Sequence, residues 1–186
     1  MRKEFGISPD DFVFMSTGQL SKRKNHEVVI KALSLCHFSK VKYLLVGFGE
    51  EEEWLKGLAK RLGVEDKVIF AGYRRDVKNL LSIVNAYVFP SIQEGLPVSL
   101  MEAMAAGLPI VCSKIRGNID LIEEEKGGYL VDPHDERAFM SRMEDIMKKD
   151  CTEMTKFNLD KMKQFDSNSI NRLMKKIYES CTDMER

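Results

Sequence analysis

The sequence predicts an α/β fold: a Rossmann-like three-layer sandwich in which helices cover both faces of a parallel sheet. Strand-like and helix-like segments alternate about six times along the 186 residues. The apolar runs of the strand-like segments are continuous rather than alternating, which is typical of strands buried on both faces. Apolar residues make up 44% of the chain, an ordinary share for one well-filled domain.

The first strand–helix unit follows a polar opening segment. Residues 1–11 are predicted to be a linker or entry segment. The apolar run Phe12–Ser16 is the first predicted strand, and its end is marked by Gly18. Asn25 is the expected N-cap of a helix from about His26 to Phe38, whose apolar positions recur at helical spacing.

The next two strands flank an acidic helix. The apolar run Val41–Val46 predicts a strand that enters the turn Gly47–Gly49. Four acids, Glu50–Glu53, then favour the positive end of a helix, which is expected to end near Gly63. A third strand is predicted at Lys67–Phe70.

Proline and glycine delimit the second half of the domain. A short helix at Val77–Val84 precedes the apolar strand Ala86–Pro90, where the missing N–H of proline ends the ladder. Pro97 suits the first position of a helix through Ala106, and Gly107 suits its C′ position. The same alternation predicts a strand at Leu108–Ser113, a short helix at Gly117–Glu123, a strand at Gly127–Asp132 and a helix at Asp135–Lys149.

The pattern after Asp150 is entirely helical. We therefore divide the chain into an entry segment (1–11), one α/β domain (12–150) and C-terminal helices (151–186). The apolar positions of the last part are Met154, Met162, Phe165, Ile170, Leu173, Met174, Ile177 and Tyr178. These methionines are typical of core filling rather than of a cofactor site.

Composition excludes several broad functions. Lysine and arginine together equal aspartate and glutamate, so no global charge attracts nucleic acid or anionic lipid. The four cysteines are scattered and do not pair with the three histidines, which predicts neither a metal site nor a disulfide framework. No signal peptide or membrane-spanning run is present, so we expect a cytoplasmic location, although a domain cut from a longer protein would look the same.

The stretch from Pro90 to Pro109 carries the clearest functional signal. It predicts a strand, a turn at Gly95 and a helix whose N-terminus, near Pro97, suits an anion such as phosphate. Two carboxylates, Glu94 and Glu102, lie close to that site. Carboxylates repel phosphate but accept hydrogen bonds from sugar hydroxyls, so we predict a phosphate-and-sugar site. The alternative is that both are solvated surface charges; we disfavour it because Glu102 stands in an otherwise apolar helix.

This stretch resembles the donor-site signature of family 4 (group 1) retaining glycosyltransferases of the GT-B fold. The match is Pro-Ser-x-x-Glu-Gly-Leu-Pro-x-x-x-x-Glu-Ala-Met-Ala-x-Gly-x-Pro, and it extends more weakly from Phe12 to Lys149. The resemblance implies the C-terminal, donor-binding half of such an enzyme. It implies that Glu102 holds the ribose and that Glu94 lies near the donor sugar. The turn Gly95, Leu96, Pro97 and Val98 would then take the diphosphate.

The basic loop, Lys22–Lys24, precedes the first helix of the domain. A run of charges is often only a solvated face, but this run follows a strand, where α/β sheets bind ligands. In the family, an arginine and a lysine here bind the diphosphate and stabilise the departing nucleotide. Lys24 matches the lysine, whereas Gln19 stands where the arginine is expected, so Arg23 or Lys22 is needed to compensate.

Two glycines and one loop complete the predicted site. Gly18 and Gly47 follow the first two strands, and Gly47 is expected to make room for the donor or for packing. The family places the loop after the third strand against the nucleobase, which suggests Tyr73 and Arg74; an ordinary turn with a capping Asp76 is the alternative.

The resemblance implies a sugar transferase that uses a nucleotide-diphosphate sugar, with uridine as the preferred base. It implies no bound metal or other cofactor, retention of anomeric configuration, and a glycan or lipid-linked acceptor. The acceptor would be held by an N-terminal half that this chain lacks, toward which the last helices are expected to pack. The chain alone would then be inactive, and any membrane contact would come through the missing half.

Three other functions compete with this prediction. A nicotinamide-dependent oxidoreductase is disfavoured, because the segment after the first strand lacks the glycine fingerprint. A nucleotide-sugar epimerase of the GT-B fold fits less well with the motif around Glu94. A non-catalytic module that binds nucleotide sugars stays open, and Gln19 slightly favours it.

Overall fold

The computed structural model describes residues 1–166, 171–172 and 174–175. Its centre is one six-stranded sheet in the order β3-β2-β1-β4-β5-β6, with every neighbouring pair parallel. The strands are β1 (Phe12–Thr17), β2 (Val41–Val46), β3 (Val68–Phe70), β4 (Ala86–Phe89), β5 (Ile110–Ser113) and β6 (Gly128–Val131). The predicted fold class, a Rossmann-like α/β sandwich, is confirmed.

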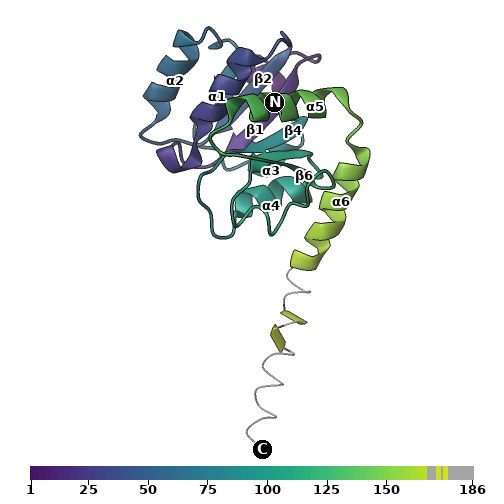
Figure 1. Ribbon diagram of the computed structural model, residues 1–186. Coiled ribbons are helices and arrows are strands. Elements are labelled where there is room, and N and C mark those ends of the chain that lie inside the picture. The colour runs from purple at the N-terminus through teal and green to yellow at the C-terminus, as the bar shows by residue number, and fades with distance from the viewer. Residues whose placement is uncertain (167–170, 173, 176–186) are drawn as a thin grey trace, which may run out of the picture.

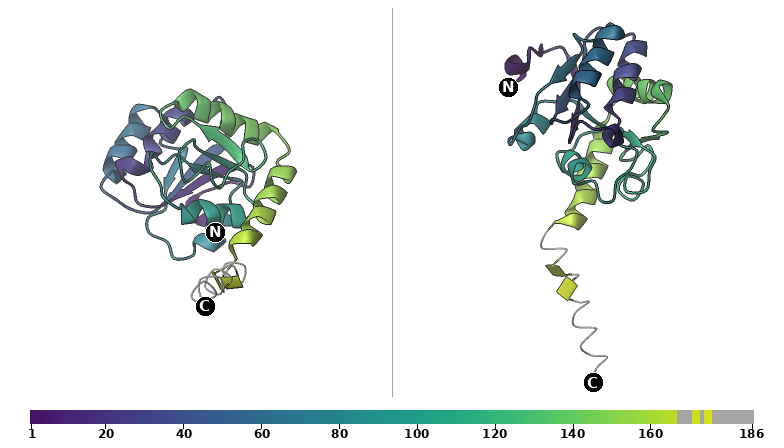
Figure 2. Two further views of the ribbon diagram at one scale, coloured as in Figure 1. Left: turned by 60° about the horizontal axis from the view of Figure 1, so that its bottom comes forward. Right: turned by 90° about the vertical axis from the view of Figure 1, so that its left-hand side faces the viewer.

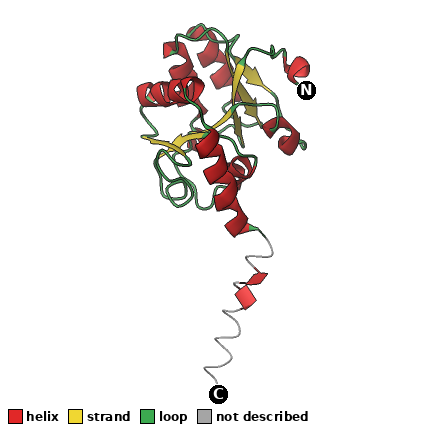
Figure 3. Cartoon of the chain, turned by 90° about the vertical axis from the view of Figure 1, so that its right-hand side faces the viewer, coloured by secondary structure: helices red, strands yellow, loops and turns green. Residues whose placement is uncertain are grey.

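Helices cover both faces of this sheet (Figures 1 and 3). They are α1 (His26–Leu35), α2 (Glu52–Arg61), α3 (Val77–Leu81), α4 (Val98–Ala105), α5 (Glu136–Lys148) and α6 (Thr152–Met162). Short 3-10 turns occur at Arg2–Phe5, Lys22–Lys24 and Lys163–Phe165. The tilted view in Figure 2 (left) shows the strands between the layer of α1, α2 and α5 and the layer that contains α4.

Alternate residues of each strand supply the two cores. In β1, Phe14 belongs to the core under α1, α2 and α5, whereas Val13 and Met15 belong to the core under α3 and α4. Because side chains alternate between the faces of a strand, a strand covered on both sides reads as one continuous apolar run. This pairing of two cores explains why the apolar runs in the sequence predicted buried parallel strands.

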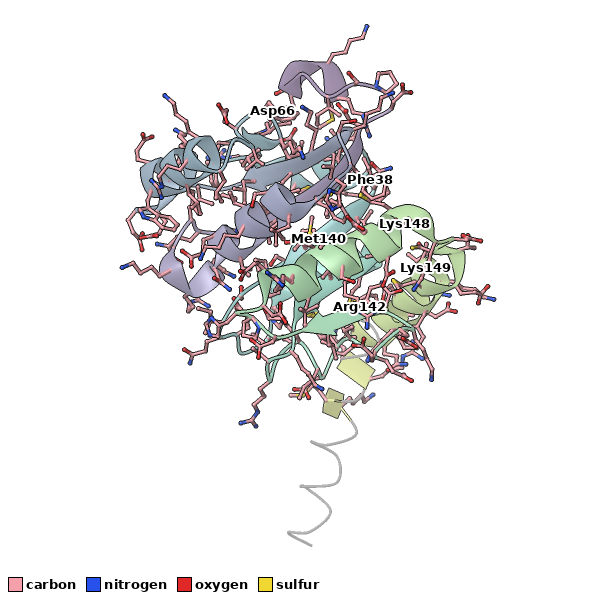
Figure 4. All side chains as sticks on the ribbon, turned by 45° about the horizontal axis from the view of Figure 1, so that its top comes forward. Phe38, Asp66, Met140, Arg142, Lys148 and Lys149 are labelled. Carbon is pink, nitrogen blue, oxygen red and sulfur yellow. The ribbon has the colours of Figure 1, made fainter. Side chains whose placement is uncertain are left out.

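Helix α5 closes the first core against α1 (Figure 4). Lys148 Nζ lies 5.3 Å from the centre of the Phe38 ring, and Arg142 lies 4.8 Å from that of Tyr129 in β6. Phe38 is not helical, because α1 ends at Leu35 and Cys36 is extended, so the predicted helix was three residues too long. Phe38 nevertheless packs against this core, as its apolar position in the sequence suggested.

The opening segment contacts the domain. Arg2 Nη1 donates to the carbonyl oxygen of Ile83 at 2.9 Å, and the Glu4 carboxylate pairs with Arg74. The boundaries proposed from the sequence for the entry segment, the domain and the C-terminal helices stay predictions.

The short helix predicted at Gly117–Glu123 is wrong. The segment is a run of turns, in which Asn118 N–H bonds to Ile115 and Leu121 N–H bonds to Asn118. The Asn118 side chain folds back and donates to the Ser113 carbonyl oxygen at 2.8 Å. An asparagine that bonds locally in this way competes with helix formation, which accounts for the error.

The predicted helix ends had mixed outcomes. Gly63 and Gly107 follow α2 and α4 with left-handed φ values of 66° and 73°, as expected of glycines after helices. Pro97 takes the N-cap position rather than the first helical one. Asn25 is the N-cap residue of α1, as predicted, but its side chain makes no capping hydrogen bond and its backbone is left-handed with φ 54°.

Helix α6 packs against α4. Met154 and Met162 are buried, as core-filling methionines should be, whereas Phe165 and Met174 are exposed. The predicted apolar positions Ile170, Leu173, Ile177 and Tyr178 lie outside the described residues. Within the described part of the chain, every helix is too short or too polar to cross a bilayer.

Candidate functional site

The candidate site lies where the strand order reverses. From β1 the sheet continues to β2 and β3 on one side, and from β4 to β5 and β6 on the other. In such sheets the loops after the two central strands diverge and leave a crevice at the carboxyl ends of the strands, the carboxyl edge. Here those loops begin at Gly18, after β1, and at Pro90, after β4.

Two cations of the basic loop converge on one carboxylate of the opposite loop. Lys24 Nζ lies 2.8 Å from Glu94 Oε1, and Arg23 Nη1 lies 3.1 Å from the same oxygen. The side chains of Lys24 and Glu94 are only 12% and 10% exposed, so water screens this pair weakly. One carboxylate cannot neutralise two cations, so the cluster keeps a net positive charge.

The backbone holds the two loops together around this cluster. Ile92 N–H donates to the Arg23 carbonyl oxygen at 2.9 Å, and Arg23 Nη1 donates to that of Gln93 at 2.9 Å. The sequence predicted Lys24 and Glu94 in one site, and the structure brings them into contact. It also places Arg23 on Glu94, while Lys22 lines a separate hollow with Trp54 and His134. Of the two residues considered as compensation for Gln19, Arg23 thus lies in the cluster with Glu94; the compensation itself stays a prediction.

Gly18 makes room for the Lys24 side chain. A Cβ at Gly18, whose φ is 142°, would lie 3.3 Å from Lys24 Cε. Lys24 Nζ also lies 5.0 Å from the centre of the Phe89 ring at the end of β4, which is a cation–π contact. Phe89 and Glu94 thus hold the lysine, and Gly18 leaves room for its side chain.

Gly47 brings the loops after β1 and β2 together. A Cβ at Gly47 would lie 1.8 Å from the Gly18 carbonyl oxygen, which is an impossible contact. The sequence left open whether this glycine makes room for donor or for packing, and the structure shows close approach of two loops. The approach shapes one wall of a pocket.

That pocket has a volume of about 410 Å³ and opens beside Gly18. Its lining contains five of the predicted site residues: Gly18, Gln19, Gly47, Tyr73 and Arg74. Phe48 and Tyr73 form its aromatic rim, with ring centres 6.1 Å apart at an interplanar angle of 75° and exposures of 62% and 66%. Sequence reasoning missed Phe48, although an aromatic residue between two glycines after a strand was an available signal.

Two predicted residues of this pocket have polar partners within the chain. Gln19 Nε2 donates to Glu50 at 3.3 Å, so its amide is directed to the α2 side of the loop. The Arg74 guanidinium pairs with Asp76 at 2.8 Å and with Glu4. Asp76 therefore serves as the partner of Arg74, and its side chain does not cap α3, contrary to the alternative considered from the sequence.

The turn before α4 presents the other predicted contacts. Leu96 and Val98 are 63% and 60% exposed, while the Gly95 carbonyl lies so close to Gly117 that a Cβ there would be 2.6 Å away. The buried Tyr87 hydroxyl lies 2.7 Å from Thr17 Oγ1. The hydroxyl oxygen also accepts a bond from Thr17 N–H at 3.1 Å, and burial raises the pKa of Tyr87. Tyr87, which the sequence did not single out, thus ties β4 to the end of β1.

Glu102 is on the exposed side of α4, on the same face as Val98. From the sequence we disfavoured a solvated charge at this position because the helix is otherwise apolar, but the side chain is exposed. Glu102 lines a separate hollow of about 410 Å³ with Lys78 and Leu81 of α3, rather than the pocket beside Gly18. Its role in holding a ribose stays a prediction.

A buried histidine lies beneath the basic loop. His26 Nδ1 is 3.0 Å from the Tyr43 hydroxyl, which in turn lies 2.7 Å from Ser16 Oγ. Burial, and secondly the charge of Lys24, lower the pKa of His26 to about 3, so this side chain is neutral near pH 7. A neutral polar network therefore supports the charged cluster.

Comparison with known proteins identifies the family. The profile of glycosyl transferases group 1 matches residues 1–172. The putative glycosyltransferase EpsD of Bacillus subtilis is 28% identical over 189 residues, covering 100% of this chain and 50% of that protein. A UDP-Gal:alpha-D-GlcNAc-diphosphoundecaprenol alpha-1,3-galactosyltransferase of Escherichia coli is 28% identical over 162 residues, covering 80% of this chain and 42% of that protein.

Solved structures share the fold. The crystal structure of Anabaena HepE in complex with UDP and glucose superposes with a TM-score of 0.87 at 26% identity, covering 96% of this chain and 50% of HepE. Sucrose-phosphate synthase from Thermosynechococcus elongatus, at 23% identity, has a TM-score of 0.86 and shows the fold alone. The chain spans half or less of the length of EpsD, the galactosyltransferase and HepE.

Proposed function

Because the chain belongs to the glycosyl transferases group 1 family, we propose that it binds a nucleotide-diphosphate sugar, with UDP-sugar preferred. In this proposal it is the C-terminal, donor-binding half of a family 4 enzyme. The whole enzyme would transfer a hexose, with retention of configuration, to a glycan or lipid-linked acceptor. The UDP-Gal donor for which the Escherichia coli galactosyltransferase is named, and the UDP and glucose in the HepE crystal structure, support the choice of uridine and of hexose.

The observation that carries this proposal is the convergence of Lys24 and Arg23 on Glu94 (2.8 and 3.1 Å). A diphosphate has at least two negative charges and several acceptor oxygens, so it competes with one carboxylate for both cations. The first turn of α4 adds free backbone N–H groups and the positive end of the helix dipole. The same crevice also has the aromatic-rimmed pocket needed for a base.

The proposed chemistry follows from where charge develops. When the bond between the anomeric carbon and the diphosphate breaks, negative charge grows on the leaving phosphate oxygen. Lys24, Arg23 and the start of α4 are the groups that would stabilise it. Glu94, released from the two cations, would accept hydrogen bonds from the donor sugar near the reacting centre. For retention, the proposed route has the acceptor hydroxyl attack from the face that the diphosphate leaves and pass its proton to the departing phosphate oxygen.

No metal ion enters this proposal, because two cations and a helix N-terminus already supply positive charge to the diphosphate. Treatment with EDTA should then leave nucleotide affinity unchanged. A loss of affinity that Mg²⁺ restores would show that the donor is bound through a metal.

The acceptor and the partner half belong to the same proposal. The chain spans about half of its relatives, so we propose that an N-terminal half binds the acceptor and faces the carboxyl edge. The C-terminal helices would pack toward that half. We propose a cytoplasmic location, in which only that N-terminal half would contact the membrane. This chain alone would bind the donor without turnover.

A second function, a non-catalytic module that binds nucleotide sugars, is favoured by one observation. Gln19 replaces the arginine expected in the family and is bonded to Glu50, so one expected phosphate contact is missing. Turnover by the full-length protein would exclude this module. Binding of UDP-glucose without hydrolysis or transfer, in the presence of candidate acceptors, would favour it.

Calorimetric titration with UDP, GDP and ADP tests the donor site. We expect saturable binding of UDP, weakened at least tenfold (about 1.4 kcal/mol) by Glu102→Gln if Glu102 holds the ribose. Glu65→Gln, at an exposed carboxylate before β3, is the matched control and should bind UDP normally. No nucleotide binding at millimolar concentration would contradict the proposal for the isolated chain, and normal binding by Glu102→Gln would remove only the ribose assignment.

A further inference from the structure

Asn25 joins three loops of the carboxyl edge through one side-chain amide. Its Nδ2 donates to the carbonyl oxygen of Pro90, after β4, at 3.1 Å and to that of Pro133, after β6, at 2.7 Å. Both partners can only accept, so the amide nitrogen and not its oxygen faces them. The two bonds use both hydrogens of the Asn25 NH₂ group, and the residue is 7% exposed.

The backbone of Asn25 explains why asparagine suits this position. The residue has φ 54° and ψ 35°, between the 3-10 turn of the basic loop and α1. Asparagine tolerates the left-handed region better than most side chains, and glycine tolerates it best. A glycine would satisfy the backbone, but only asparagine also supplies two donors to the neighbouring loops.

The amide bridge lies directly behind the ion pair of the site. Lys24 precedes Asn25, and Pro90 lies four residues before Glu94, so two of the three loops that Asn25 joins carry one member of the pair each. A backbone bond also joins these two loops, from Ile92 N–H to the Arg23 carbonyl oxygen at 2.9 Å. Loss of the amide would leave the relative position of the loops to that bond, to the contacts of the Arg23 side chain with Gln93 and Glu94, and to the Lys24–Glu94 ion pair.

We propose that Asn25 is a positioning residue, which sets the approach of Lys24 to Glu94 and thereby prepares the diphosphate site. The identity of the ligand, a diphosphate, rests on the proposed function. The positioning of Lys24 against Glu94 by Asn25 does not depend on that function. Asn25 acts through Lys24 and does not itself touch the donor. The bond to Pro133 also fixes the loop after β6 to the loops that carry Lys24 and Glu94.

A matched control exists at the opposite ends of the strands, their amino ends. Asn158 of α6 is buried, and its Nδ2 donates to the carbonyl oxygens of Leu108 and Gly127 at 2.9 and 2.8 Å. Those residues precede β5 and β6, so this bridge lies at the amino ends of the strands, far from Lys24 in the fold. Asn158→Ala removes the same kind of contact without touching the site.

The test is a double-mutant cycle between Lys24→Met and Glu94→Gln, measured by urea unfolding, in three backgrounds. In the wild-type background, the effect of one change on the unfolding equilibrium constant should differ about fivefold according to whether the other change is present. Asn25→Gly, which keeps the left-handed backbone and removes the amide, should reduce this coupling to less than twofold. Asn158→Ala should lower stability yet leave the coupling intact.

The same variants are then titrated with UDP. Asn25→Gly should weaken UDP binding about tenfold, whereas Asn158→Ala should bind UDP as the wild type does. Unchanged Lys24–Glu94 coupling in Asn25→Gly, or no coupling in the wild type, would overturn the inference. Coupling that Asn25→Gly removes in a chain that binds no nucleotide would support the positioning role and contradict the proposed donor site instead.

Discussion

The two edges of the sheet are joined by the same kind of contact but surrounded by different chemistry. At the amino edge, where the strands begin, the Asn158 amide bridges Leu108 and Gly127. At the carboxyl edge, the Asn25 amide bridges Pro90 and Pro133. Left-handed backbone and closely packed glycines occur at both bridges, but the carboxyl-edge bridge also lies beside the partly buried ion pair of Lys24 and Glu94.

The difference shows how one structural device serves two purposes. Buried carbonyl oxygens beyond the ends of strands need donors, and an asparagine amide can satisfy two of them at once. At the amino edge this contact only supplies donors to buried carbonyl oxygens and so stabilises the fold. At the carboxyl edge the same contact also fixes the distance between charges on separate loops. Changes at the amino edge should therefore lower stability alone, and changes at the carboxyl edge should alter ligand binding.

The largest expected effect is that of Gly47→Ala. The new Cβ would lie 1.8 Å from the Gly18 carbonyl oxygen at a residue with φ 144°, so the loops after β1 and β2 must separate. We expect a loss of about 3 kcal/mol or more in the free energy of unfolding, with loss of nucleotide binding. Urea unfolding and calorimetry measure both.

Gly63→Ala separates backbone strain from loop contact. Gly63 has φ 66° and nothing within 4 Å of the position of a Cβ, and it lies at the amino edge before β3. This variant should lose only about 1 kcal/mol and should bind nucleotide normally. Equal losses in the two variants would contradict the role of loop contact at Gly47.

The next effect is a pH dependence that comes from His26. Its pKa falls from 6.5 in the unfolded chain to about 3 in the folded protein, first because of burial and then because of Lys24. The unfolded state therefore takes up a proton below pH 6.5 that the folded state refuses. Stability should be complete above pH 6.5 and fall by about 2 kcal/mol between pH 7.5 and pH 5 from this group.

The measurement is urea unfolding across this pH range for the wild type and His26→Gln. Replacing His26 should remove its part of the slope, whatever it does to stability at pH 7.5. His37→Gln, at an exposed histidine before β2, should keep the slope. A wild-type slope that survives in His26→Gln would show that another group causes it.

A smaller effect is expected for Lys24→Met. The variant removes one of two cations from the diphosphate site, and we expect UDP affinity to fall about 10- to 30-fold (about 1.4–2 kcal/mol). Lys67→Met, at the amino edge, removes a lysine that bonds only the Phe38 carbonyl among the contacts described and should leave UDP affinity unchanged. Equal effects of the two changes would mean that general charge, not the Lys24 site, attracts the nucleotide.

The smallest effect has the opposite sign. Glu94→Gln removes the carboxylate that competes with a diphosphate for Arg23 and Lys24. UDP, which has no sugar, should bind about two- to fivefold more tightly (about 0.4–1 kcal/mol), while transfer by the full-length enzyme should be lost. Glu144→Gln, which removes the partner of Lys148 in α5, is the control. Weaker UDP binding by Glu94→Gln would show that the carboxylate does not compete with the nucleotide.

Much of the fold was predictable because its signals are local. The run Val41–Val46 became β2 without change, and the strand after Ala86 and the helix after Pro97 were each within a residue or two. The predictions failed where a side-chain amide bonds to backbone carbonyl oxygens, because hydrophobic periodicity does not reveal such bonds. The Asn118 amide replaced a helix by turns, and the Asn25 amide left its own helix uncapped to bond two distant carbonyls.

The site was predicted in composition but not in arrangement. Lys24 and Glu94 were expected in one site, and they are in contact, but the sharing of Glu94 by Arg23 was not foreseen. Glu102 was expected to be surrounded by apolar residues and is exposed instead, because only one face of α4 meets the sheet. Phe48 and Tyr87 were missed, since their roles depend on loops that are distant in sequence.

Local sequence patterns were enough to predict the six strands, most of the helices, the burial of the strands on both faces and the strand–turn–helix around Glu94. Which charges meet depends on tertiary packing. Lys24 and Glu94 are separated by 70 residues, and Asn25 and Pro133 by 108. The physical reason is that periodicity and turn residues act over a few positions, whereas the meeting of two loops depends on which strands lie side by side. That neighbourhood is set by packing of the whole sheet, and it places the loops of β1, β4 and β6 at one edge.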